Sequence, residues 1–214
     1  MLRPFLLVGV GGSGGKTLRA VHQSLSLRLQ QEGWKRGWPS AWQLLHVDSP
    51  INQDGAAFPA PFLDPENYFA LVAPGTSYQI SFGAALKNVP QKVYADVDRS
   101  LPSDKQVGVN VTIGAGKFRA IGRTLVLARL DDLKSRIRKS LGDLSSDGAL
   151  SELQTLASLL GAKQGAVKNS PIVIVVSSIA GGSGAGQFME VTEAIKNCRP
   201  TEPWVHGIYS ILYA

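Results

Sequence analysis

The chain has 214 residues, of which 44% are hydrophobic and 18% are charged. This composition excludes a disordered chain and is typical of a folded core. The length predicts a single domain over residues 1–214. Lys and Arg outnumber Asp and Glu by 22 to 16, giving a net charge of +6. The basic residues are scattered rather than gathered in runs, so we expect no nucleic acid partner.

No apolar run reaches the roughly 18 residues that cross a bilayer, so no membrane insertion is expected. Cys198 is the single cysteine, which excludes an internal disulfide and a cysteine-built metal site. Asp96 and Asp98 have a spacing found in metal sites, but we expect them to be solvated in a proline-rich segment. We therefore expect a cytoplasmic protein without a metal site of its own.

The first predicted element is a strand over residues 4–10, a continuous apolar run typical of a parallel sheet covered on both faces. Glycine-rich residues 11–15 follow, and helical spacing of leucines predicts a helix over residues 16–31. A second strand is predicted over residues 42–47, ending at Asp48. Strand, turn, helix and strand form a βαβ unit, which predicts a parallel sheet with a right-handed crossover.

Residues 49–106 are rich in proline, and we expect a long, partly helical excursion over the surface. The later part of the chain is predicted to alternate strands and helices. These elements are a strand over 107–113, a helix over 121–141, a weaker helix over 150–160 before a flexible tail, a β-branched strand over 171–176, a helix over 187–197 and a strand over 204–213.

Together these elements predict a three-layer, Rossmann-like α/β domain with a mainly parallel sheet. Histidines 46 and 206 lie in apolar strands and are expected to be satisfied core residues. Tryptophans 34, 38 and 42 are expected to cover the edge of the sheet rather than stack on bases.

Two glycine-rich loops, at residues 11–15 and 181–186, each follow a strand and open a helix. Glycine tolerates positive φ and carries no side chain, so backbone N–H groups can approach an anion closely. The helix that follows adds the positive end of its dipole and its free N–H groups. With a third glycine loop at residues 114–116, the sequence predicts a polyphosphate ligand.

The first loop reads GVGGSGGKT over residues 9–17. It misses the P-loop motif by one residue, because Val10 stands where the first glycine is required. It matches the dinucleotide fingerprint through Gly9, Gly11 and Gly14, but Asp48 comes much later than the acidic residue of that motif. Three alternatives stay open: a P-loop-like ATP-binding protein using Lys16, a dinucleotide-binding oxidoreductase, and a scaffold that binds no nucleotide.

The tubulin/FtsZ superfamily offers a resemblance that covers all the loops. Residues 180–186 (AGGSGAG) resemble its signature G-G-G-T-G-S/T-G, and residues 9–16 resemble its first phosphate loop, G-x-G-G-x-G-G-N, with Lys16 in place of Asn. Residues 114–123 (GAGKFRAIGR) are similar to the γ-phosphate loop of the bacterial division GTPase, and Asp48 stands where that family has the Asp of its second loop. The chain resembles bacterial tubulin-like proteins outside the division-protein branch.

This resemblance implies binding of GTP or GDP, with Mg²⁺ held through the phosphates, and self-association or polymerisation. It implies a set of nucleotide-binding residues from three loops. They are Gly11, Gly12, Ser13 and Gly14 at the α- and β-phosphates, Gly181, Gly182, Ser183 and Gly184 at the β-phosphate, and Ala115, Gly116 and Lys117 at the γ-phosphate, with Lys16 and Asp48 beside them. Lys16 could turn toward phosphate as a point charge or weaken guanine selectivity. Asp48 could contact the ligand or form a turn.

The resemblance assigns no catalytic residue to this chain. In the family, the hydrolytic aspartates follow the fifth strand and act on the nucleotide of the neighbouring subunit. We therefore expect this sequence to precede the base-clamping segment, the central helix and the second domain of the family. On its own it is expected to bind nucleotide weakly and to hydrolyse little.

Overall fold

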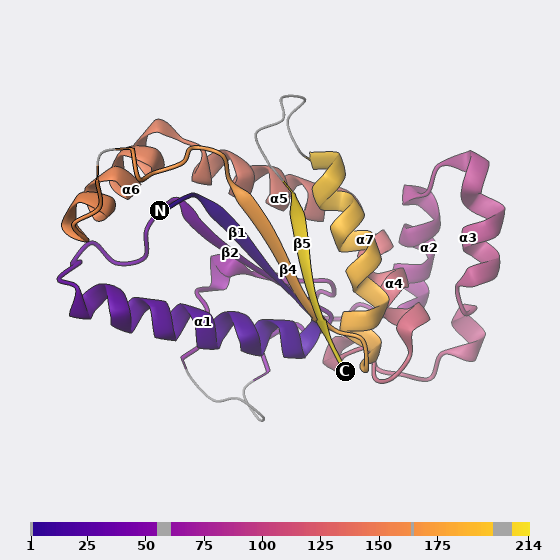
Figure 1. Ribbon diagram of the computed structural model, residues 1–214. Coiled ribbons are helices and arrows are strands. Elements are labelled where there is room, and N and C mark those ends of the chain that lie inside the picture. The colour runs from indigo at the N-terminus through magenta and orange to yellow at the C-terminus, as the bar shows by residue number, and fades with distance from the viewer. Residues whose placement is uncertain (1, 55–60, 164, 199–206) are drawn as a thin grey trace.

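A computed structural model describes residues 2–54, 61–163, 165–198 and 207–214. Its sheet has five parallel strands in the order β3-β2-β1-β4-β5 (Figure 1). The strands are β1 (Phe5–Val10), β2 (Trp42–Asp48), β3 (Tyr68–Ala70), β4 (Ile172–Ser178) and β5 (Ile208–Tyr213). The prediction of a mainly parallel sheet is confirmed.

The α-helices of the described residues pack on the two sides of this sheet or against one another. They are α1 (Gly11–Gln31), α2 (Tyr78–Asn88), α3 (Tyr94–Ser100), α4 (Arg119–Ala128), α5 (Leu130–Leu144), α6 (Asp147–Leu159) and α7 (Gly182–Cys198). Helix α1 covers one face, while α5 and α7 cover the other (Figure 1). Helix α4 packs against α7, and α2 packs against α4. The three-layer α/β architecture is therefore as predicted.

The apolar run of β1 is buried on both faces of the sheet. Leu6 and Val8 pack with Ile137 of α5 and Val191 of α7. Leu7 points to the opposite face and belongs to the cluster that contains Leu18 of α1. Because successive side chains of a strand alternate between faces, a strand between two helical layers must be apolar at every position. This explains the continuous hydrophobic run in the sequence.

A separate cluster closes the end of the sheet where the strands begin. Trp34 and Trp42 are buried there with Leu29 of α1 and Leu153 of α6. The ring of Phe5, at the start of β1, stacks on Trp42 with ring centroids 5.3 Å apart. Trp34 and Trp42 therefore take part in packing at the end of the sheet opposite the carboxyl ends of the strands.

Two helices begin earlier than predicted, and both begin inside a glycine-rich loop. Helix α1 starts at Gly11 rather than residue 16, and α7 starts at Gly182 rather than residue 187. Glycine has low helix propensity, and for this reason the sequence predicted both helices to start after the glycines. In the fold, close packing between the two loops overrides that propensity, since these positions allow backbone to approach backbone.

Two further predictions are wrong. Residues 107–113 form no strand; the side chain of Asn110 accepts a hydrogen bond from the backbone N–H of Thr112, and this local turn competes with extended structure. The single helix predicted over 121–141 is two helices that meet at Arg129, whose side chain pairs with Asp132 at 2.7 Å. Acidic residues in the first turn of α5 favour a new helix start there.

The last predicted strand is shorter in the structure, where β5 begins at Ile208. Residues 204–206, including His206, lie outside the described residues. The bridge between Leu2 and Val167 ties the predicted tail after α6 to the start of the chain. No helix in the described part of the chain is long and apolar enough to cross a bilayer.

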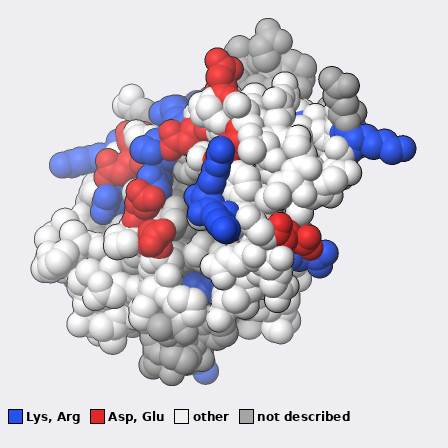
Figure 2. All heavy atoms as spheres, turned by 90° about the vertical axis from the view of Figure 1, so that its left-hand side faces the viewer, with Lys and Arg blue, Asp and Glu red and all other residues white. Residues whose placement is uncertain are grey.

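Basic and acidic side chains are interspersed on the face shown in Figure 2. Several basic residues of the chain form local ion pairs with acidic neighbours one helical turn away. Along α5 these pairs are Arg129–Asp132, Lys134–Asp131 and Lys139–Asp143. Exposed pairs of this kind contribute about 0–1 kcal/mol each, so they describe a solvated surface rather than a stabilising network.

Candidate functional site

The predicted loops meet at the carboxyl edge of the sheet. In the parallel register, Val10 of β1 lies beside Val47 of β2 and Ser177 of β4. The chain runs from β1 to β2 and β3 on one side, whereas β4 and β5 lie on the other side of β1. The strand order therefore reverses between β1 and β4. In open α/β sheets, ligands bind in the crevice at such a switch point.

The two glycine loops touch each other at this point. A Cβ atom built on Gly11 would lie 2.5 Å from the backbone nitrogen of Gly184, so a side chain there would collide with the second loop. Gly11 also has a φ of +72°, which disfavours any other residue. Gly12 and Gly181 differ, because the nearest atom to a Cβ on Gly12 is Oδ2 of Asp48 at 3.7 Å and nothing lies within 4 Å of one on Gly181. Gly181 therefore borders open space, and a Cβ on Gly12 would make only an ordinary contact with Asp48.

Each loop supplies the first turn of a helix. Val10, at the N-cap of α1, forms no side-chain cap hydrogen bond, and neither helix has an acidic residue in its first turn. The first N–H groups of an α-helix have no partner within that helix. Two helix N-termini with positive dipole ends therefore converge where the glycine loops meet, and this geometry favours an anion.

The third glycine loop packs against the start of α7. The backbone N–H of Gly182 donates to the carbonyl of Gly116 at 3.1 Å, and Gly116 has a φ of +58°. The side chain of Ala115 is buried in the main core, so it can face a ligand only through its backbone. Lys117 is exposed, and no ion pair is found for it among the described residues.

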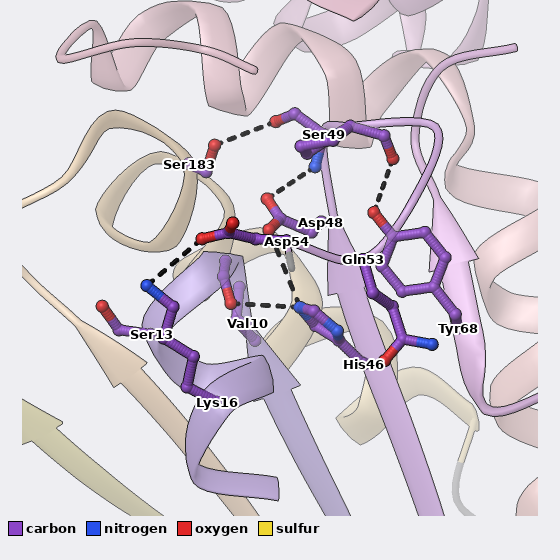
Figure 3. A network of polar contacts seen from close by, with 12 residues as sticks. Val10, Ser13, Lys16, His46, Asp48, Ser49, Gln53, Asp54, Tyr68 and Ser183 are labelled. Atoms are coloured by element: carbon purple, nitrogen blue, oxygen red, sulfur yellow. Dashed lines mark hydrogen bonds and ion pairs between the residues drawn. The ribbon is translucent and has the colours of Figure 1, made fainter. Parts of the chain in front are cut away.

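Lys16 does not point freely into the site. Its Nζ lies 3.2 Å from Oδ2 of Asp54 in the segment that follows β2, as Figure 3 shows. The two side chains are about one-third exposed. Ion pairs this accessible are weak because water and salt screen them. A phosphate group could therefore compete with Asp54 for Lys16.

Asp48 and His46 lie beneath the first loop, at the end of β2. Both are buried, and His46 Nε2 is 3.7 Å from Oδ2 of Asp48 and 3.2 Å from the carbonyl oxygen of Gly11 (Figure 3). A Cβ on Gly15 would lie 2.0 Å from Cε1 of this ring. The expectation that His46 is a buried core residue is confirmed, but it is only partly satisfied, since its Nδ1 has no partner within the described residues. The imidazole therefore supports the first loop from below.

The segment after β2 is anchored by Tyr68 of β3. Its hydroxyl donates to the carbonyl of Pro50 at 2.5 Å (Figure 3). Burial raises the pKa of the Tyr68 hydroxyl above its usual value, and the negative charge of Asp48 raises it further. The group therefore stays a protonated donor at neutral pH, and it holds the start of the segment that carries Asp54.

Ser49 connects this segment to the second loop. Its backbone N–H donates to Oδ1 of Asp48 at 2.7 Å, and its Oγ lies 3.1 Å from Oγ of Ser183 (Figure 3). The side-chain amide of Gln187, in α7, donates to the same Ser49 oxygen at 2.7 Å. A buried polar chain therefore links the interior of α7, the end of β2 and the second glycine loop.

The structure brings the three predicted loops and Asp48 to one edge of the sheet. Gly14 and Gly184 are packed against backbone, whereas Gly181 faces open space and Gly12 has the Asp48 carboxylate as its nearest neighbour. Sequence reasoning missed a second set of residues that surround these loops: His46 as a support for the first loop, Ser49, Asp54 and Gln187. No motif marks them: His46 and Ser49 lie next to Asp48 in the sequence, but their contacts with the loops, like those of Asp54 and Gln187, are tertiary.

The described residues contain no group of three or more His, Cys, Asp or Glu side chains that could hold a metal ion. The carboxylates of Asp48 and Asp54 nevertheless lie at the same edge as the glycine loops (Figure 3). Mg²⁺ is commonly held by one or two carboxylates together with phosphate oxygens. The residues present therefore fit a cation that arrives with a polyphosphate, rather than a metal site made by the protein alone.

Comparison with known proteins identifies the family. A family profile described as "tubulin like" matches residues 6–213, which is nearly the whole chain and includes all three glycine loops. The chain therefore belongs to the tubulin-like family. A comparison with curated proteins gave no significant match.

Proposed function

We propose that this chain binds a guanine nucleotide, GTP or GDP, with its phosphates between the two glycine loops. The observation that carries the proposal is the convergence of the N-termini of α1 and α7 at the switch point between β1 and β4. Open space beside Gly181, and the lack of any close contact at Gly12, leave room for phosphate oxygens near the first N–H groups of the two helices. Membership of the tubulin-like family favours guanine over other bases.

In this proposal Lys16 and Lys117 supply the charged contacts. Lys16 leaves Asp54 for a phosphate oxygen, and Lys117 approaches the γ-phosphate from the third loop. Mg²⁺ is carried by the phosphates, with Asp48 or Asp54 as the nearest carboxylates. Binding of nucleotide is proposed to promote self-association, as the family relationship suggests.

The strand order of this sheet also occurs in dinucleotide-binding domains, where an acidic residue at the end of the second strand binds ribose. Asp48 occupies that place in the chain, so a dinucleotide is the second candidate. Two observations favour the guanine nucleotide: the third loop packs on the start of α7, and the Asp48 carboxylate is already bonded to the backbone of Ser49.

Calorimetric titration with GTP, ATP and NAD in the presence of Mg²⁺ separates the candidates. We expect GTP to bind most tightly, with one nucleotide per chain. A preference for ATP or for NAD would overturn the proposal in favour of that ligand, and binding of none of them would leave a scaffold of the same fold. Sedimentation with and without GTP then tests self-association, which the proposal expects to increase with the nucleotide.

A further inference from the structure

In the buried polar chain from Gln187 to Ser183, each group donates a hydrogen bond to the next. Gln187 is fully buried in α7, and its Nε2 donates to Ser49 Oγ at 2.7 Å. Ser49 is also fully buried, and its Oγ lies 3.1 Å from Oγ of Ser183. Ser183 is only half-buried and belongs to the second glycine loop. The chain of contacts therefore begins in the core and ends at the candidate site.

The orientation of the Gln187 amide determines which group donates and which accepts along this chain. Its Oε1 is buried and has no hydrogen-bond partner among the described residues. Turning the amide around would place this oxygen on Ser49 and leave both N–H donors of the NH₂ group without partners. A side-chain amide has two donors on nitrogen, and each buried donor left unpaired costs free energy. The orientation in which Gln187 donates leaves one N–H and the Oε1 unpaired among the described residues, whereas the reverse leaves two N–H groups unpaired. The first is favoured because unpaired buried donors are rarer in proteins than unpaired buried acceptors.

A hydroxyl group has one proton to donate. Since Ser49 Oγ accepts from Gln187, its own proton is available for Ser183, which lies at hydrogen-bond distance. Ser183 Oγ then accepts from Ser49, and its proton is directed away from Ser49. In the reverse arrangement, Ser183 would donate to Ser49, and its oxygen would have only lone pairs left for a ligand. The first arrangement suits an anionic ligand and the second does not.

We infer that Gln187 and Ser49 are positioning residues that make Ser183 a hydrogen-bond donor to a phosphate oxygen of the nucleotide. The inference rests on the proposed function. Hydrogen bonds to a charged acceptor are about twice as strong as neutral ones, so a hydroxyl fixed as a donor favours anions over neutral ligands.

A double-mutant cycle tests this inference, with affinity for GTP measured by calorimetry in the presence of Mg²⁺. We expect Ser183→Ala to weaken binding about tenfold, and Ser49→Ala about fivefold. In the Ser183→Ala background, Ser49→Ala should have no further effect, because Ser49 acts through the hydroxyl that has been removed. Gln187→Met keeps the size of the side chain but removes the donor, and it should behave like Ser49→Ala.

Ser140→Ala is the matched control, since Ser140 in α5 is also a buried serine and its hydroxyl has no partner among the described residues. This variant should bind GTP like the unchanged protein, and circular dichroism should show that every variant is folded. Equal losses from Ser49→Ala in both backgrounds, or no loss in either, would overturn the inference while GTP binding by the unchanged chain still stands. Failure of the unchanged chain to bind GTP would instead overturn the proposed function, and this inference with it.

Discussion

The two glycine loops are alike in backbone but differ in the side chains around them. Each follows a central strand, opens a long helix and lies at the same edge of the sheet. The first loop is surrounded by charged and titratable groups: Lys16, Asp54, Asp48 and His46. The second is bordered by the neutral Ser49, Ser183 and Gln187.

This difference predicts two separate contributions to binding. The Lys16–Asp54 pair is partly exposed, so its attraction for a phosphate should fall as salt is added. The Gln187–Ser49–Ser183 chain is mostly buried, so its contribution should depend on hydrogen-bond geometry and little on salt. The first loop therefore supplies adjustable charge, and the second supplies fixed donors.

The largest effect is expected where the two loops touch. Gly11→Ala places a Cβ atom against the backbone of Gly184 at a position with positive φ. We expect it to lower the free energy of unfolding by about 3 kcal/mol and to abolish nucleotide binding. Gly12→Ala, one residue on, should cost less than about 1 kcal/mol, because the nearest atom to its Cβ is Oδ2 of Asp48 at 3.7 Å, an ordinary contact. Urea unfolding compares the two, and equal losses would show that the loops are not packed as described.

The next largest effect is a difference in salt dependence between variants of the two loops. At about 50 mM salt, Lys16→Met is expected to weaken GTP binding roughly tenfold, and at about 500 mM salt the loss should shrink to roughly threefold. The loss caused by Ser183→Ala should stay nearly constant over the same range, because the hydroxyl carries no charge. Fluorescence titration with a labelled GTP measures both. Parallel salt dependence in the two variants would contradict the division into a charged and a neutral loop.

Removing the competitor of Lys16 should have a smaller and opposite effect. Asp54→Asn frees Lys16, and affinity for GTP is expected to rise about threefold at low salt. The backbone carbonyl of Asp54, which accepts from Arg19 at 2.8 Å, is unchanged by the substitution. The free energy of unfolding should fall, because the Asp54 carboxylate is also a charge partner of the buried Arg19 guanidinium. A fall in affinity would instead indicate that Asp54 contacts the nucleotide or its Mg²⁺.

Substitution of Lys117 in the third loop should have the smallest effect on affinity, and only for GTP. Lys117 is exposed beside Gly116, and in the proposal it approaches the γ-phosphate alone. Lys117→Ala is therefore expected to weaken GTP binding about twofold and to leave GDP binding unchanged. Paired titrations with the two nucleotides measure this. An equal loss for GDP would place Lys117 near the α- or β-phosphate.

Much of the fold could be predicted from local patterns. Strands β1, β2 and β4 were predicted because their residues are mostly apolar, as expected for strands that helices cover on both faces of the sheet. The starts of α1 and α7 could not be predicted, because glycines with low helix propensity are held in helix by contacts between the loops. The strand predicted over 107–113 does not form, because the backbone N–H of Thr112 donates to the side chain of Asn110 in a local turn.

The site was predicted in part for the same reason. Its backbone half, the glycine loops and Asp48, follows directly after strands and has recognisable spacing. The remaining side chains reach the site from elsewhere: Asp54 lies in a proline-rich segment, and Gln187 lies inside α7. Their roles depend on which segments pack together, and a single sequence does not contain that information in any local pattern.

Gly181 offers the most direct test of the central claim, that a phosphate group binds N–H groups in the first turn of α7 beyond that of Gly182, which is paired with Gly116. Gly181 immediately precedes this helix, and nothing lies within 4 Å of a Cβ at its position. Aspartate is a favoured N-cap residue, and its carboxylate would accept from the same N–H groups. Gly181→Asp should therefore stabilise the fold slightly while blocking the ligand, whereas Gly181→Ala leaves the N–H groups free.

The measurement is calorimetric titration of both variants with GTP and Mg²⁺, beside urea unfolding. We predict that Gly181→Ala binds GTP like the unchanged chain. Gly181→Asp should lose at least about 30-fold in affinity, with its free energy of unfolding unchanged or raised by about 0.5 kcal/mol. Undiminished GTP binding by a folded Gly181→Asp variant would contradict the claim that the start of α7 holds the phosphates.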